Sequence, residues 1–115
     1  MSYDHRLLCE QLSLRLHRYP SISLHELSKQ LRVSRRTLQR AVIAVKGKRF
    51  RDLQEELLLA RVESLLMATP CLAIKELSFQ IGYQSPRSFA RAVRSAWGLS
   101  PEQLRAHIGL LTSAN

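Results

Sequence analysis

Apolar residues recur along the chain three, four or seven positions apart, and a proline or glycine follows most of these runs. This spacing is typical of helices with one buried face, and no stretch alternates apolar and polar residues as a strand would. The pattern therefore predicts an all-α fold. It places seven helices at about 3–18, 24–31, 35–46, 50–68, 73–81, 86–97 and 101–108, and it leaves 110–115 as a frayed tail.

Serine stands immediately before several of these helices, where its hydroxyl can accept a hydrogen bond from an unpaired N–H group of the first turn. These expected N-cap residues are Ser23, Ser34, Ser85 and Ser100, and a proline follows the last two. Ser23 and Glu26 have the spacing of a capping box, in which the glutamate also accepts from the backbone of the serine. The helix that begins near Ala73 has no such residue, so its first turn is expected to lack a side-chain cap.

A helical unit occurs twice along the chain. The segment 24–31 returns as 74–81, and the segment 38–42 returns one residue further on as 89–93. Each copy combines a short helix, a tight turn and a second helix with basic residues in its first two turns, which is the pattern of a helix-turn-helix. The sequence thus predicts two helix-turn-helix lobes joined by a long linker helix. The expected boundaries are 1–48 for the N-terminal lobe, 49–69 for the linker, 70–109 for the C-terminal lobe and 110–115 for the tail.

Apolar residues at helical spacing are expected to be buried as the scaffold of each lobe. In the first copy they are Leu24, Leu27, Leu31, Val33, Leu38 and Val42, and in the second Ile74, Leu77, Ile81, Phe89, Val93 and Trp97. The first helix adds a stripe of Tyr3, Leu7, Leu8, Leu12 and Leu16. Cys9 and Cys71 follow no ligand or disulfide spacing and are expected to be buried, reduced thiols.

Basic residues dominate the charge of the chain. It carries 18 Lys and Arg against 9 Asp and Glu, a net charge of +9, and every charged residue from Lys29 to Arg51 is basic. A surface this basic attracts polyanions, and two arginine-bearing helices favour a periodic target, duplex DNA. No apolar run reaches the roughly eighteen residues of a membrane span, so no membrane role is expected.

The outward side of each second helix carries side chains suited to DNA. Arginine can form two hydrogen bonds to guanine and glutamine two to adenine, and small side chains can lie near thymine methyl groups. The candidate base-reading residues are Arg35, Arg36, Gln39 and Arg40 in the first copy and Arg87, Ala90 and Arg91 in the second. The candidate phosphate contacts are Arg32, Lys46, Lys48, Arg49 and Arg94.

Two segments carry a more specific signal. The first runs Val33-Ser34-Arg35-Arg36-Thr37-Leu38-Gln39-Arg40. The second runs Ile74-x-Glu76-Leu77-Ser78-x-Gln80-Ile81-Gly82-Tyr83-Gln84-Ser85-Pro86-x-Ser88-Phe89-x-Arg91-Ala92-Val93, then Trp97-Gly98-Leu99-Ser100-Pro101-x-x-Leu104-Arg105. The first resembles the first recognition helix of AraC/XylS-type transcription regulators, and the second resembles the C-terminal signature of that family. The resemblance covers about Leu7 to His107.

This resemblance implies that one polypeptide binds two successive major-groove segments. It assigns base-facing positions to Arg36, Gln39 and Arg40 in the first lobe and to Pro86, Arg87, Ala90 and Arg91 in the second. Pro86 and Ala90 have no side-chain donor, so the second lobe is expected mainly to hold phosphates or to respond to DNA shape. The chain departs from the family pattern at Leu58, Val62 and Val93, where arginine, alanine and phenylalanine are usual.

The expected partners follow from the same resemblance. They are a double-stranded DNA operator and RNA polymerase, and the expected location is the bacterial nucleoid in the cytoplasm. Many members carry a separate ligand-binding or dimerisation domain, for which this chain has no room, so neither a small-molecule effector nor a cofactor is expected within it. The chain is either a short stand-alone regulator or the DNA-binding part of a longer protein, and Met1 favours the first.

Two rival interpretations come from other functional classes. An enzyme would need an assembled site, but the four histidines are scattered and no Cys/His spacing fits zinc. An interaction module that contacts RNA polymerase and binds DNA only weakly is the stronger rival. The acidic residues Asp52, Glu55 and Glu56 suit such a contact, although a solvated helix face is the better interpretation of them.

Overall fold

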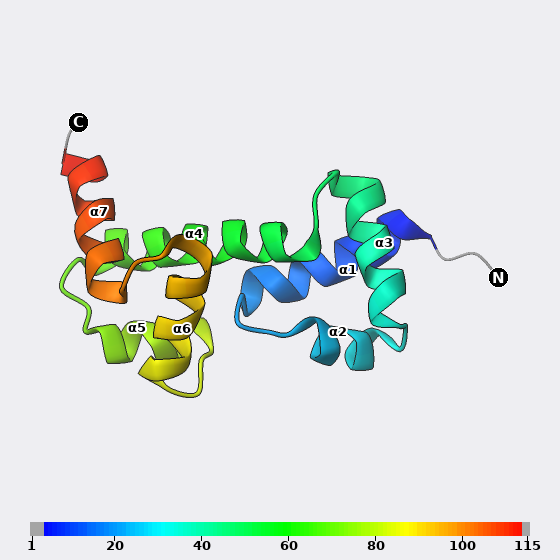
Figure 1. Ribbon diagram of the computed structural model, residues 1–115, viewed down its shortest axis with the longest axis horizontal. Coiled ribbons are helices and arrows are strands. Elements are labelled where there is room, and N and C mark those ends of the chain that lie inside the picture. Colours follow the sequence, from blue (N-terminus) through cyan, green and yellow to red (C-terminus); the bar gives the residue numbers. More distant parts are fainter. Residues whose placement is uncertain (1–3, 114–115) are drawn as a thin grey trace. The chain divides into compact units, whose positions relative to one another are not determined.

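In the computed structural model, residues 4–113 are described and form seven α-helices without a strand (Figure 1). The helices are α1 (His5–Arg18), α2 (Leu24–Leu31), α3 (Arg35–Lys46), α4 (Phe50–Ala68), α5 (Ile74–Ile81), α6 (Pro86–Trp97) and α7 (Pro101–Ser113). The all-α prediction is confirmed. The chain divides into two compact units, and the division falls within α4, between Leu58 and Leu59.

The first unit is built around α1, which α3 crosses and against which α2 also packs (Figure 1). Its core residues come from α1, α2, α3 and the start of α4 and are Leu12, Leu16, Leu27, Leu38, Val42, Phe50 and Leu53. Leu8, Ile22, Leu24, Leu31, Val33 and Leu57 pack against them and are partly buried. The predicted scaffold of the first copy therefore forms one core. The prediction for Leu7 is wrong, because Leu7 is exposed, whereas the expected burial of Cys9 is confirmed.

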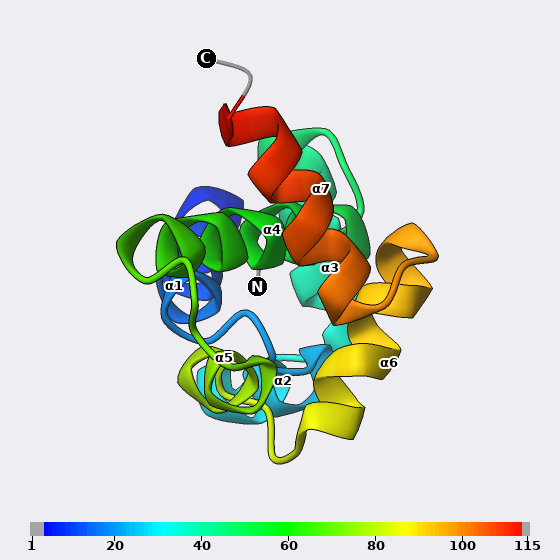
Figure 2. The ribbon, with the colours of Figure 1, turned by 90° about the vertical axis from the view of Figure 1, so that its left-hand side faces the viewer.

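In the second unit, α6 packs against both α5 and α7 (Figure 2). Its buried side chains include Leu77, Ile81, Phe89, Val93, Leu104 and Ile108, while Ile74 and Trp97 are half-buried. Tyr83 packs on Phe89, with ring centroids 5.4 Å apart, and burial raises the pKa of the Tyr83 phenol to about 12. One prediction fails here, because Cys71 is exposed rather than buried.

The two helix-turn-helix turns close in the same way. In the first, the N–H of Val33 donates to the carbonyl of Ser28 at 3.1 Å, and in the second the N–H of Tyr83 donates to the carbonyl of Ser78 at 3.0 Å. This bond is the mark of a Schellman motif, which needs a left-handed residue after the helix. Gly82 takes that place in α5, with φ of 113°, whereas α2 uses Arg32, with φ of 58°. The second turn is one residue longer, and this accounts for the shift in the repeat.

Each unit also fixes the loop that precedes its helix-turn-helix. The side-chain amide of Gln54 donates to the carbonyls of Pro20 and Ile22, at 3.0 and 2.7 Å. At the equivalent place in the second unit, the guanidinium of Arg105 donates to the carbonyl of Leu72. In both units, the helix after the recognition helix therefore holds the loop that leads into the motif.

Both chain ends refine the predicted helix limits. The first helix begins at His5 rather than near Tyr3, because the Asp4 carboxylate caps it by accepting from the N–H groups of Arg6 and Leu7; Tyr3 lies outside the described residues. The predicted end of the last helix near Ile108 is wrong, since α7 continues to Ser113. Gly109 keeps a helical backbone there, unlike Gly47 and Gly98, which end α3 and α6 in the left-handed region. Residues 114–115 of the predicted tail lie outside the described residues.

The caps of α2 and α5 provide a matched test of local stability. Ser23 accepts from the N–H of Glu26 at 3.0 Å, whereas Ala73 leaves α5 without a side-chain cap. Ala73 already has the extended backbone that a cap requires. We expect Ala73→Ser to raise the free energy of unfolding by about 1 kcal/mol and Ser23→Ala to lower it by a similar amount, as measured by urea denaturation. Equal midpoints for wild type and Ala73→Ser would contradict this account.

Candidate nucleic-acid interface

The two second helices of the repeat, α3 and α6, start with the same cap. Ser34 accepts from the N–H of Thr37 at 3.1 Å, and the two hydroxyls are 2.8 Å apart. Ser85 accepts from the N–H of Ser88 at 3.1 Å, and these hydroxyls are 3.1 Å apart. Equivalent positions can therefore be compared directly. Arg35 corresponds to Pro86, Arg36 to Arg87, Gln39 to Ala90, Arg40 to Arg91 and Ile43 to Arg94.

Helix α3 presents its polar side chains on the face opposite the core. Leu38 and Val42 are fully buried, and they fix the rotation of the helix. The predicted base-reading residues Arg35, Arg36, Gln39 and Arg40 are all exposed. None of them forms a side-chain hydrogen bond or an ion pair within the described part of the chain. This face therefore carries several hydrogen-bond donors that are available to a ligand.

Helix α6 likewise turns its apolar side toward the core of its own unit, but its exposed side carries different residues. Phe89 and Val93 are its buried anchors, and Arg87, Arg91 and Arg94 are exposed on the other side. Two of the positions assigned to DNA by resemblance, Pro86 and Ala90, are half-buried. The α6 face thus supplies positive charge from three arginines, whereas Ala90 stands where α3 has an amide.

The predicted phosphate contacts fall into two groups. Arg32, Lys46 and Arg94 are exposed and have no ion pair within residues 4–113. Lys48 and Arg49 are instead engaged by acids of α4. The ammonium of Lys48 lies 2.7 Å from the carboxylate of Glu56, and the guanidinium of Arg49 donates twice to Asp52, at 3.1 and 3.3 Å.

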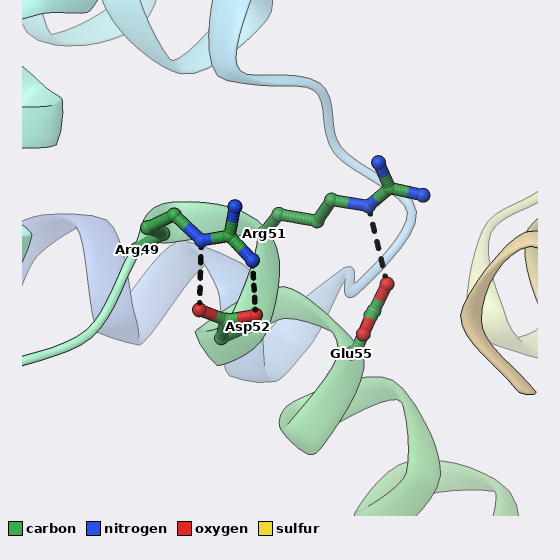
Figure 3. Close-up of polar contacts among 4 residues, drawn as sticks. All are labelled: Arg49, Arg51, Asp52 and Glu55. Carbon is green, nitrogen blue, oxygen red and sulfur yellow. Dashed lines mark hydrogen bonds and ion pairs between the residues drawn. The ribbon is translucent and has the colours of Figure 1, made fainter.

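These ion pairs form a row at the start of α4, shown in part in Figure 3. Beside the Arg49–Asp52 pair, the guanidinium of Arg51 donates to the carboxylate of Glu55 at 3.2 Å. The hydrogen bond from Arg49 holds the pKa of Asp52 below its usual value, and the same bond raises the pKa of Arg49. The acidic patch Asp52, Glu55 and Glu56 is therefore neutralised by basic residues of the same unit.

A shallow hollow adjoins the polar face of α3. It is lined by Gln39, Ile43, Arg49, Phe50 and Arg51. Ile43 is 53% exposed although it is a large apolar residue. Ile43 is not among the residues predicted from the sequence, because the candidates on this face are all polar or basic. Helical spacing alone could have placed Ile43 on this face, since it follows Arg36 by seven positions and Gln39 by four.

Other kinds of site find no support in the described residues. No three His, Cys, Asp or Glu side chains within residues 4–113 lie close enough together to hold a metal ion. No helix in the same part of the chain is both long and apolar enough to cross a membrane.

Comparisons with known proteins agree with this geometry. The model of a helix-turn-helix domain family matches residues 27–107. The C-terminal domain of AraT, a response regulator from Geobacillus stearothermophilus, is 25% identical, with a TM-score of 0.66 over 90% of this chain and 84% of that one. A transcriptional regulator with an AraC-type DNA-binding domain from Chromobacterium violaceum is 26% identical, with a TM-score of 0.59 over 88% and 90% of the two chains.

A third solved structure supports the fold alone. The C-terminal domain of the two-component response regulator YesN from Fusobacterium nucleatum is 21% identical, with a TM-score of 0.64 over 87% of this chain and 96% of that one. No curated protein matches the sequence. The family model covers most of the chain, from within α2 of the first helix-turn-helix motif through the whole of the second. The chain belongs to the AraC-type helix-turn-helix family of DNA-binding transcription regulator domains.

Proposed function

We propose that the chain binds one asymmetric duplex DNA site, with α3 and α6 each entering the major groove. The observation that carries this proposal is the face of α3, where three donor-bearing side chains, Arg36, Gln39 and Arg40, are exposed and unengaged above a buried apolar anchor. In a helix-turn-helix, residues near the start of the second helix contact base edges. The repeat gives α6 the equivalent role, and two such helices fit successive groove segments about 10 base pairs apart.

We further propose that the two helices contribute differently. Helix α3 combines arginines with Gln39, so it can distinguish guanine and adenine through paired hydrogen bonds. Helix α6 has Ala90 and Pro86 at the corresponding places, and its three exposed arginines favour contacts to phosphate. Sequence preference would then come mainly from the first unit and sequence-independent affinity mainly from the second.

The rival interaction-module interpretation has less support. Its candidate contact was the acidic patch, and each of the three carboxylates there is already paired with a basic side chain. Contact with RNA polymerase stays a prediction, as does a location at the bacterial nucleoid, where a DNA-binding regulator would act. The enzymatic alternative has no support, because the family consists of DNA-binding domains and not of enzymes.

Selection from a random duplex pool tests the main proposal. We expect the selected site to be asymmetric and about 20 base pairs long, since two unlike helices would each contact one groove segment. Affinity should fall steeply with salt, with a slope of about −0.9 per neutralised phosphate. Filter binding at several salt concentrations measures that slope. A slope shallower than about −3, or a palindromic site bound only by a dimer, would argue against this binding mode.

Single substitutions separate base contacts from phosphate contacts. We expect Arg40→Ala to cost about 1–3 kcal/mol on the selected site and to relax the preference at one base pair, because a paired guanine contact is lost. Arg91→Ala should weaken binding to all sequences about equally and flatten the salt slope by about one unit. Lys46→Ala is the reference for a phosphate contact, since Lys48 is held by Glu56. A loss of preference in Arg91→Ala would show that α6 also distinguishes bases.

The Arg49–Asp52 pair predicts a substitution that strengthens binding. Asp52→Asn removes the carboxylate that holds the Arg49 guanidinium, which then becomes available to a phosphate. We expect higher affinity for every duplex and a salt slope steeper by about one unit. Glu10→Gln is the control, because it makes the same change in net charge on an exposed residue of α1. Equal effects of the two substitutions would mean that only the overall charge acts and that Arg49 does not contact DNA.

A further inference from the structure

Ile43 lies in the middle of the polar face of α3. On a helix with 3.6 residues per turn, it projects about 20° from Arg36 and between Gln39 and Arg40. More than half of its side chain is exposed. An exposed isoleucine is ordinary by itself. Its position at the centre of the proposed base-contacting face is what calls for a function.

The surroundings of Ile43 favour a nucleic acid over a protein as the group that covers it. Arg40 and Lys46 are its neighbours on α3, three residues before and after it, and the hollow beside it is completed by Arg49, Phe50 and Arg51. Arg49 and Arg51 are paired with Asp52 and Glu55, so the unpaired positive charge beside Ile43 comes from Arg40 and Lys46. An apolar spot next to such cations suits a ligand that is anionic around a small apolar group. Duplex DNA has this character in the major groove, where the C5-methyl group of thymine lies among base-edge donors and acceptors and is bordered by phosphates.

We propose that Ile43 is a specificity-determining residue that contacts a thymine methyl group. The inference rests on the proposed function and adds a contact to it. Ile43 is four residues beyond Gln39, which is about 6 Å along the helix axis. Successive base pairs are about 3.4 Å apart. The thymine therefore lies within about two base pairs of the adenine that Gln39 contacts.

The second unit offers an internal comparison. Arg94 occupies the position in α6 that Ile43 occupies in α3, and it is likewise exposed. The same place in the fold thus carries an apolar side chain in one unit and a cation in the other. Since a methyl contact depends on sequence and a phosphate contact does not, this difference agrees with the unequal roles proposed for α3 and α6.

Deoxyuridine substitution tests the contact, because it removes only the methyl group from a thymine. Each thymine of the selected duplex is replaced in turn, and Kd is measured for wild type, Ile43→Ala and Val45→Ala. Val45 is the matched control, since it is 40% exposed on the same helix and projects to the opposite side from Arg36. At one thymine we expect wild type and Val45→Ala to lose affinity about fourfold, the effect of one buried methyl group. Ile43→Ala should bind both duplexes equally.

A second variant guards against a folding effect. Ile43→Arg places the residue of the second unit in the first, and it should bind all duplexes more tightly, steepen the salt slope by about one unit and ignore the methyl group. The ratio of the two Kd values within each variant is independent of its active fraction. If Ile43→Ala still loses affinity when the methyl group is removed, or if wild type loses affinity at no thymine, the inference fails while the proposed function stands. Absence of salt-dependent duplex binding would overturn both.

Discussion

The closure of each helix-turn-helix turn is the constraint on which the interface depends. The bond from Val33 to Ser28, and its counterpart from Tyr83 to Ser78, sets the direction in which the chain leaves the first helix of the motif. Only after that turn can a serine cap start the next helix with its apolar side on the core. The exposed side of α3 or α6 is then determined, because burial of Leu38 or Phe89 fixes the rotation of the helix.

Closing the turn costs more backbone conformational free energy in the first unit than in the second. A left-handed backbone conformation costs about 1–2 kcal/mol for a residue with a Cβ atom, and Gly82 avoids this cost where Arg32 does not. The turn holds because Val33 packs on the core and because Gln54 fixes the preceding loop at two carbonyls. Arg32 is exposed and lies just before α3, so the strained position places a cation beside the proposed DNA-binding face.

The sequence predicts those features that depend on local chemistry. Caps, glycine stops and apolar spacing determine the helices between residues 24 and 97, and they also identify most of the buried scaffold. The predictions are wrong or incomplete where tertiary packing or side-chain geometry determines burial, helix length or ion pairing. Rotation of α1 exposes Leu7, and Gly109 continues α7 because nothing there requires a left-handed turn. Lys48 and Arg49 pair with Glu56 and Asp52 because the start of α4 brings these side chains together. A count of charges along the sequence does not show such pairs.

The two units repeat one scaffold and carry different surfaces, which is what the proposed division of roles between α3 and α6 requires. The buried positions of the two units are chemically alike, since Phe89 and Val93 occupy the positions in α6 that Leu38 and Val42 occupy in α3. The surface positions differ, since α6 has Ala90 and Arg94 where α3 has Gln39 and Ile43. Core residues must keep the turn and the helix rotation, whereas surface residues are free to differ without loss of stability. The proposed difference between a base-contacting α3 and a phosphate-contacting α6 is therefore compatible with a common fold.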